Sequence, residues 1–131
     1  MGFLKPYAEK IYALLRIVAG LMFTLHGMQK IFGLFGGAPP QAPPFIVYGA
    51  GGIELVAGAL IAVGLLVGPA AFIASGEMAV AFFLGHVAQS KNINPIENHG
   101  ELAVLYSWLF LFMAAKGAGT WSVDEARGKS A

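Results

Sequence analysis

The chain has 131 residues, of which 57% are hydrophobic and only 11% charged, and its formal net charge is +1. A typical soluble domain carries about 25% charged residues, so this composition excludes a soluble globular enzyme, a disordered chain and a nucleic-acid binder with a basic face. The absence of cysteine excludes a disulfide, an iron–sulfur site, a thiolate zinc site and a thiol nucleophile. A small integral membrane protein in a lipid bilayer remains.

Four continuous apolar stretches follow one another along the chain, over about residues 11–32, 45–67, 70–88 and 101–117. A spanning helix needs about 20 mostly apolar residues, which the first three stretches supply and the fourth reaches only with its flanks. The apolar residues are continuous and do not alternate, which argues against strands. The sequence therefore predicts one all-α domain, an integral membrane four-helix bundle.

The connections between these stretches are short. Residues 36–44 contain four prolines, which fix φ and remove donors, so we expect an extended loop there. Gly68-Pro69 is predicted to form a tight helical hairpin, residues 89–100 a polar loop, and residues 118–131 a short polar tail.

The basic residues indicate the orientation in the membrane. The side with both termini carries five of them and the opposite side two: Lys5, Lys10, Lys116, Arg127 and Lys129 against Lys30 and Lys91. Because cytoplasmic segments are enriched in Lys and Arg, both termini are predicted to be cytoplasmic. Arg16 interrupts the first apolar stretch, so no cleaved signal peptide is expected.

Ionisable residues inside the spans are the candidate functional residues, because charges are costly in lipid. A rise of about 1.5 Å per residue places Arg16 and Glu77 at one inner level, roughly 10 Å from the cytoplasmic helix ends. A buried ion pair that fixes helix register is the first interpretation of these two residues. The alternative is that Glu77 carries a proton or binds an anion.

A second, outer level holds His26, Glu54, His86 and Glu101 at about 20–24 Å, capped by Lys30. These groups are compatible with a quinone head group, with a metal, with a haem between the two histidines, or with a polar network in which His26 bonds Glu54. No Glu-x-x-His pair occurs, so no metal site is predicted. Two histidines at one depth are weak support for haem, which is disfavoured. Quinone stays open, no cofactor is firmly implied, and no catalytic residue is assigned.

Glycines are frequent in the second apolar stretch, at Gly49, Gly51, Gly52, Gly58 and Gly64. Small residues let membrane helices approach closely. We expect them to serve packing within the chain first and a homo-oligomer second.

Three groups of residues resemble the motifs of the DoxX family. The opening group is Leu15-Arg16, Gly20, Phe23 and the run from His26 to Gly33. The second is Gly52-x-Glu54 with Gly58, and the closing group is Gly100-Glu101 followed by Gly117-x-Gly119-x-x-Ser122-x-Asp124. The resemblance extends over residues from about 10 to 125.

The resemblance implies a four-helix protein of the bacterial inner membrane. Relatives include the small subunit of a thiosulfate:quinone oxidoreductase, and others are linked with membrane-associated oxidoreductase assemblies. The positions that carry over from the motifs are Arg16, His26, Lys30, Glu54, Glu101, Ser122 and Asp124. Because this chain has no cysteine, thiol or persulfide chemistry would belong to a partner or a substrate.

Three functions follow as hypotheses. The first is a redox-associated subunit that acts with a partner and contacts a quinone, with His26 and Lys30 as donors and Glu54 as proton acceptor. The second is a non-catalytic structural or assembly subunit of a larger membrane complex. The third is a small proton-coupled transporter with Glu54 or Glu77 as its coupling carboxylate. Whether the chain turns over a substrate by itself is left open.

Overall fold

A computed structural model describes residues 1–128, and that part of the chain is helical with no strand. The polar tail predicted over residues 118–131 extends past residue 128, so its residues 129–131 lie outside the described residues. The elements are η1 (Gly2–Tyr7), α1 (Ala8–Phe32), α2 (Pro44–Val63), α3 (Val67–Val80), the π-helical η2 (Ala81–Val87), α4 (Ala88–Ser90), α5 (Glu101–Lys116) and α6 (Val123–Ala126). The predicted all-α class is confirmed.

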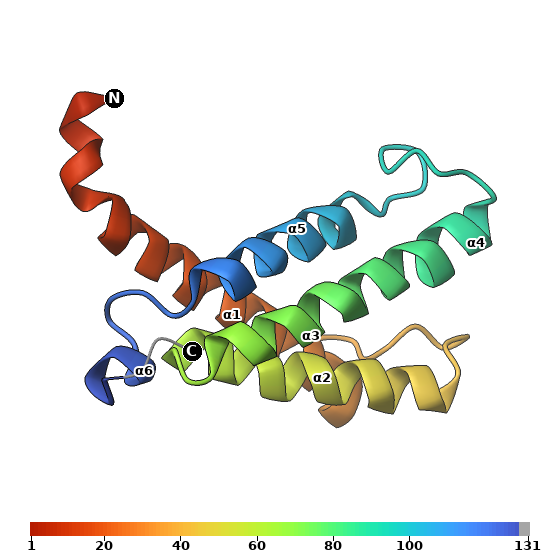
Figure 1. Ribbon diagram of the computed structural model, residues 1–131. Coiled ribbons are helices and arrows are strands. Elements are labelled where there is room, and N and C mark those ends of the chain that lie inside the picture. The colour runs from red at the N-terminus through yellow and green to blue at the C-terminus, as the bar shows by residue number, and fades with distance from the viewer. Residues whose placement is uncertain (129–131) are drawn as a thin grey trace.

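Three helical segments in residues 1–128 are long and apolar enough to cross a membrane: Gly2–Phe32, Pro44–Val63 and Val67–Ser90. The third segment joins α3, η2 and α4. Helix α5 has 16 residues and is therefore only about 24 Å long. It packs along α3, whereas α1 packs along α2, so the molecule consists of two helix pairs joined through α2 and α3 (Figure 1).

Glycines bring α1 and α2 into backbone contact. A Cβ added to Gly20 would lie 2.8 Å from the carbonyl oxygen of Gly58, and one added to Gly27 would lie 2.8 Å from that of Gly51. Real Cβ atoms do not approach so closely, so the helix pair requires glycine at these positions. The expected packing role within the chain is confirmed for Gly51 and Gly58.

The turn between α2 and α3 differs from the prediction. Helix α2 ends at Gly64, which has a left-handed φ of 79° and whose N–H donates to the carbonyl of Leu60 at 2.9 Å. Gly68 and Pro69 lie in the first turn of α3 instead of forming the hairpin. A proline is tolerated there because the first N–H groups of a helix have no partner within the helix.

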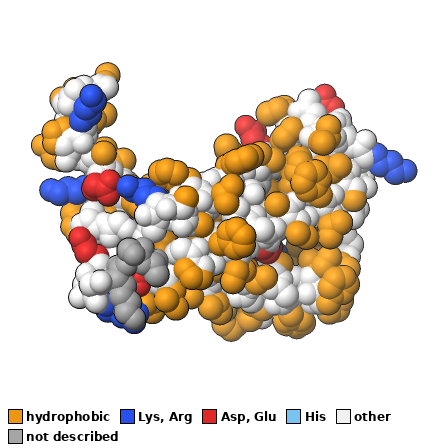
Figure 2. Space-filling view, in the orientation of Figure 1, with side chains coloured by type: hydrophobic (Ala, Val, Ile, Leu, Met, Phe, Trp, Pro, Cys, Tyr) orange, Lys and Arg blue, Asp and Glu red, His pale blue; other side chains and the backbone are white. Residues whose placement is uncertain are grey.

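An aromatic cluster joins the two helix pairs. Phe23 of α1 lies 4.7 Å from Phe110 of α5, measured between ring centroids, and Tyr106 stacks on Phe110 at 5.2 Å. Outside this core, the visible face of the molecule is largely apolar, and the lysine and arginine side chains gather at its two ends (Figure 2). An apolar belt between charged ends suits a bilayer.

Candidate functional site

Lys30 and Glu54 form the centre of the polar interior. The Lys30 ammonium donates to Glu54 Oε2 at 2.7 Å and to Oε1 at 3.0 Å. Glu54 is 2% exposed, while the Lys30 side chain keeps 20% of its surface. A Cβ on Gly51 would lie 2.8 Å from the Lys30 Cβ, so that glycine makes room for the lysine stem. The expected bond from His26 to Glu54 is replaced by this ion pair.

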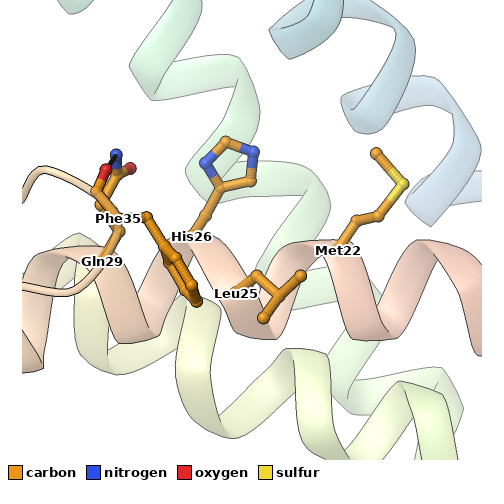
Figure 3. Close-up of a pocket in the computed structure, with 5 residues that line it drawn as sticks. All are labelled: Met22, Leu25, His26, Gln29 and Phe35. Atoms are coloured by element: carbon orange, nitrogen blue, oxygen red, sulfur yellow. Dashed lines mark hydrogen bonds between the residues drawn. The ribbon is translucent and has the colours of Figure 1, made fainter.

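His26 lies beside the ion pair, on the face of α1 that lines a cavity of about 280 Å³. Its imidazole is partly exposed and makes an edge-on contact with the Tyr106 ring, with 6.5 Å between centroids. Figure 3 shows His26 projecting from α1 next to the other lining residues, which are Met22, Leu25, Gln29 and Phe35. The cavity thus offers a mainly apolar wall and one imidazole.

The loop residue Phe35 reaches this cavity through a local constraint. Its backbone is left-handed, with a φ of 54°. The Gln29 amide nitrogen donates to the Phe35 carbonyl at 3.2 Å, which holds the loop against α1. The Phe35 ring is therefore held among the residues that line the open cavity.

His86 does not join this polar group. Its Nδ1 lies 3.1 Å from the carbonyl oxygen of Asn98 in the loop before α5. Asn98 is buried, donates to the Asn92 carbonyl at 2.9 Å and accepts from the Gly100 N–H at 2.8 Å. His86 therefore helps to fix the loop. In residues 1–128 no group of three or more His, Cys, Asp or Glu side chains is arranged to hold a metal ion.

Glu101 lies at the start of α5 and is exposed. An acidic side chain in the first turn stabilises a helix through the positive end of its dipole. Together with five neighbours it lines a second, shallow cavity of about 430 Å³, formed with Pro95, Ile96, His99, Leu102 and Leu105. The sequence placed Glu101 at the depth of His26, but its environment here is the helix end.

Arg16 is fully buried and binds backbone carbonyl oxygens, so the predicted ion pair with Glu77 is wrong. Nη1 donates to the carbonyls of Ile61 at 2.7 Å and Ala62 at 2.9 Å, in the last turn of α2. Nη2 donates to the Trp121 carbonyl at 2.7 Å. The carbonyls at a helix C-terminus lack partners and carry the negative end of the dipole, so they bind the two Nη atoms without a carboxylate. Arg16 Nε has no hydrogen-bond partner among the described residues.

Residues 117–127, which we name the C-terminal clasp, fold back over the turn between α2 and α3. The Asp124 N–H donates to the Gly64 carbonyl at 2.9 Å, and Asp124 Oδ2 accepts from the Val67 N–H at 3.3 Å. Asp124 is fully buried, and its carboxylate caps the start of α3 by accepting this hydrogen bond from Val67. Ser122 caps α6, because its Oγ accepts from the Glu125 N–H at 3.1 Å.

The glycines of the clasp fit it to α1. The Tyr12 hydroxyl donates to the Gly117 carbonyl at 2.6 Å. Gly119 has a φ of 67°, and a Cβ there would lie 2.9 Å from the Tyr12 ring. The residues predicted as a closing motif, Gly117, Gly119, Ser122 and Asp124, thus act together as a structural element that holds Arg16.

Four buried side-chain atoms have no hydrogen-bond partner among the described residues. Arg16 Nε and Asp124 Oδ1 lie at the clasp, and the other two are Glu77 Oε2 and the Tyr106 hydroxyl oxygen. The latter two side chains lie close enough to Glu54 to interact with its charge. Tyr106 was missed at the sequence level, since a tyrosine in an apolar stretch gives no charge signal. Most buried polar groups are satisfied, so these two mark an unusual place.

Comparison with known proteins extends the sequence observations. The DoxX family model matches residues 11–87, which include Arg16, His26, Lys30 and Glu54. A relative from Haemophilus influenzae, described as an uncharacterized protein, is 43% identical over 129 residues, covering 95% of this chain and 96% of the relative. No solved structure matches the chain. The family match covers more than half of the chain, and the chain therefore belongs to the DoxX family.

Proposed function

We propose that this DoxX protein is a membrane subunit that binds a quinone in the cavity at His26 and acts with a partner oxidoreductase. The observation that carries the proposal is this cavity, in which one imidazole lies within a mainly apolar wall beside the buried Lys30–Glu54 pair. A quinone has a flat apolar ring and carbonyl oxygens at its edge. Apolar pockets with few polar groups are typical sites for such molecules.

The roles of the side chains follow from their contacts. Met22, Leu25 and Phe35 provide the apolar surface for the ring, and the His26 N–H donates to a quinone carbonyl oxygen. Lys30 was expected as a second donor, but its ammonium is bound by Glu54. Reduction of a quinone to a quinol consumes two electrons and two protons. The partner supplies the electrons, and the His26 imidazole, which has one nitrogen that donates and one that accepts a proton, relays protons.

Photolabelling with an azidoquinone tests this proposal. The purified protein in lipid nanodiscs is labelled, digested and mapped by mass spectrometry. We expect labels on α1 and at Phe35, and at least a tenfold loss of labelling in His26→Ala. The matched control is His99→Ala, which changes the second cavity. Unchanged labelling in His26→Ala, or labels confined to the second cavity, would contradict the proposal.

We further propose that α5 is a fourth membrane span, with both termini in the cytoplasm of a bacterial inner membrane. Helix α5 packs along α3, and Glu101 and Lys116 lie at its two ends. The distribution of basic residues supports this orientation, since five lie on the side of both termini and two, Lys30 and Lys91, on the opposite side. A fluorescent protein fused to the C-terminus should fluoresce, whereas an alkaline phosphatase fusion should be inactive.

A second candidate function, an assembly subunit, is supported by four glycines. A Cβ at any of these positions would meet nothing within 4 Å, so another helix has room to approach closely at Gly49, Gly52, Gly76 and Gly85. Native mass spectrometry of the protein extracted with its lipids tests this candidate. A homo-oligomer or a stable complex that Gly76→Ile or Gly52→Ile disrupts would support it, and a monomer unaffected by both substitutions would contradict it.

A further inference from the structure

Away from Arg16 and Asp124 at the clasp, the helices α1, α2 and α3 bring one ammonium group and two carboxyl groups into the bundle interior. Lys30 from α1 donates to both oxygens of Glu54 from α2, so its charge is balanced by that carboxylate. Glu77 enters from α3; its side chain is half-buried, and its buried Oε2 has no partner among the described residues. Helix α3 packs against α2, the helix of Glu54, and Glu77 lies within range of the charges of Lys30 and Glu54. The second carboxyl group therefore lies near a cation that another side chain already occupies.

Tyr106 contributes from α5. It is 5% exposed, its hydroxyl has no partner among the described residues, and it interacts with Glu54. Its ring makes an edge-on contact with His26 from α1. A tyrosine hydroxyl both donates and accepts hydrogen bonds. The fourth element of the bundle thus places a proton-carrying group between the His26 cavity and the buried carboxylates.

Charge balance decides the state of this group of side chains. A carboxylate without a cation in an apolar interior is costly and becomes neutral by binding a proton. With one lysine and two glutamates, the electrically neutral arrangement has one ionised and one protonated carboxyl group. The two hydrogen bonds from Lys30 identify Glu54 as the ionised one.

We propose that Glu77 is a proton-binding site inside the bundle, and that the Lys30–Glu54 ion pair controls whether the proton stays. Glu77 holds the proton while Lys30 is bound to Glu54. When Lys30 is released from Glu54 and reaches Glu77, the proton leaves Glu77 and Glu54 takes one up. The proton that leaves Glu77 would serve a quinone in the His26 cavity. This destination alone rests on the proposed quinone function.

Infrared spectroscopy tests the site, because a protonated carboxyl group has its own C=O stretching band, which shifts in D2O. At pH 7 the exposed glutamates are ionised and do not contribute to this band. We expect a band in the wild-type protein that is absent in Glu77→Gln. The matched control is Glu101→Gln, which removes an exposed carboxylate and should keep the band.

Two further variants test the control by Lys30. In Glu54→Gln the lysine loses its partner and pairs with Glu77, so the band should disappear although Glu77 is present. In Lys30→Met both carboxyl groups bind protons, so the Glu77 band should be joined by a second of similar intensity. Circular dichroism and size-exclusion chromatography verify folding; should Lys30→Met not fold, Glu54→Gln carries this test. A band that survives in Glu77→Gln, or in Glu54→Gln, would overturn the proposal.

The proton site and the quinone site fail independently. If only the quinone proposal is wrong, the infrared pattern is unchanged and azidoquinone labelling does not depend on His26. If only the proton site is wrong, labelling depends on His26 and the band is insensitive to Glu77→Gln.

Discussion

The Lys30 ammonium donates to both carboxylate oxygens of Glu54, to Oε2 at 2.7 Å and to Oε1 at 3.0 Å. The pair connects the last turn of α1 to the middle of α2, next to the glycine contact between these helices. Glu54 is almost fully buried, so removal of the lysine leaves a charge or forces a proton onto the carboxylate. This pair therefore contributes to both the stability and the proton chemistry of the bundle.

Lys30→Met should lower the free energy of unfolding by about 2 kcal/mol, less than for a fully buried pair because the lysine keeps a fifth of its surface. The double variant Lys30→Met/Glu54→Gln should recover part of this loss, since no unpaired charge remains. Thermal unfolding in detergent, followed by circular dichroism, measures both effects. Lys91→Met, at an exposed loop position, is the control and should change little. Equal stability of Lys30→Met and wild type would contradict the assigned role.

Arg16→Lys should destabilise the protein by about 2–4 kcal/mol, because a lysine cannot reproduce the planar fork that reaches two backbone segments. The guanidinium bonds the Ile61 and Ala62 carbonyls with one nitrogen and the Trp121 carbonyl with the other. The measurement is the unfolding midpoint in a mild detergent. The same substitution at the exposed Arg127 serves as the control. A midpoint shift no larger than that of Arg127→Lys would refute this prediction.

Gly27→Ala should cost about 1–3 kcal/mol, because the new methyl group meets the backbone of α2 and forces the helices apart. Gly76→Ala should be neutral or stabilising by up to about 1 kcal/mol, since nothing lies within 4 Å and alanine has the higher helix propensity. The two identical substitutions, compared by thermal unfolding, separate helix contact from propensity. Similar effects at both positions would show that the α1–α2 contact is not required.

Asp124→Ala should loosen the C-terminal clasp, because the Val67 N–H loses its acceptor at a cost of about 1 kcal/mol. Limited proteolysis should then cleave residues 117–127 faster than in the wild type. Asp124→Asn keeps an acceptor oxygen and should protect the clasp better than alanine. If Asp124→Asn and Asp124→Ala are cleaved at the same rate, the helix cap on Val67 does not hold the clasp, and the prediction is contradicted.

Local sequence patterns determined the helical class and the main apolar segments. Hydropathy and length act residue by residue along a helix, so the ends of Ala8–Phe32 and Pro44–Val63 lie within four residues of the predicted spans. Depth along a helix is equally local, which is why Lys30 and Glu54 were placed in the same layer before any contact was known. The same calculation placed Arg16 and Glu77 at one depth, although these two residues do not form an ion pair.

Only the tertiary structure decided which groups at a given depth meet. Depth does not specify the direction in which a side chain points around its helix, and that direction is set here by the glycine contact between α1 and α2. The clasp adds a second non-local constraint, since it returns to the α2–α3 turn and provides the Trp121 carbonyl that Arg16 binds. Both Nη atoms of Arg16 thereby bind backbone carbonyls instead of Glu77. Glu77 Oε2 is buried with no partner among the described residues, and this lack of a partner favours a proton on the carboxyl group.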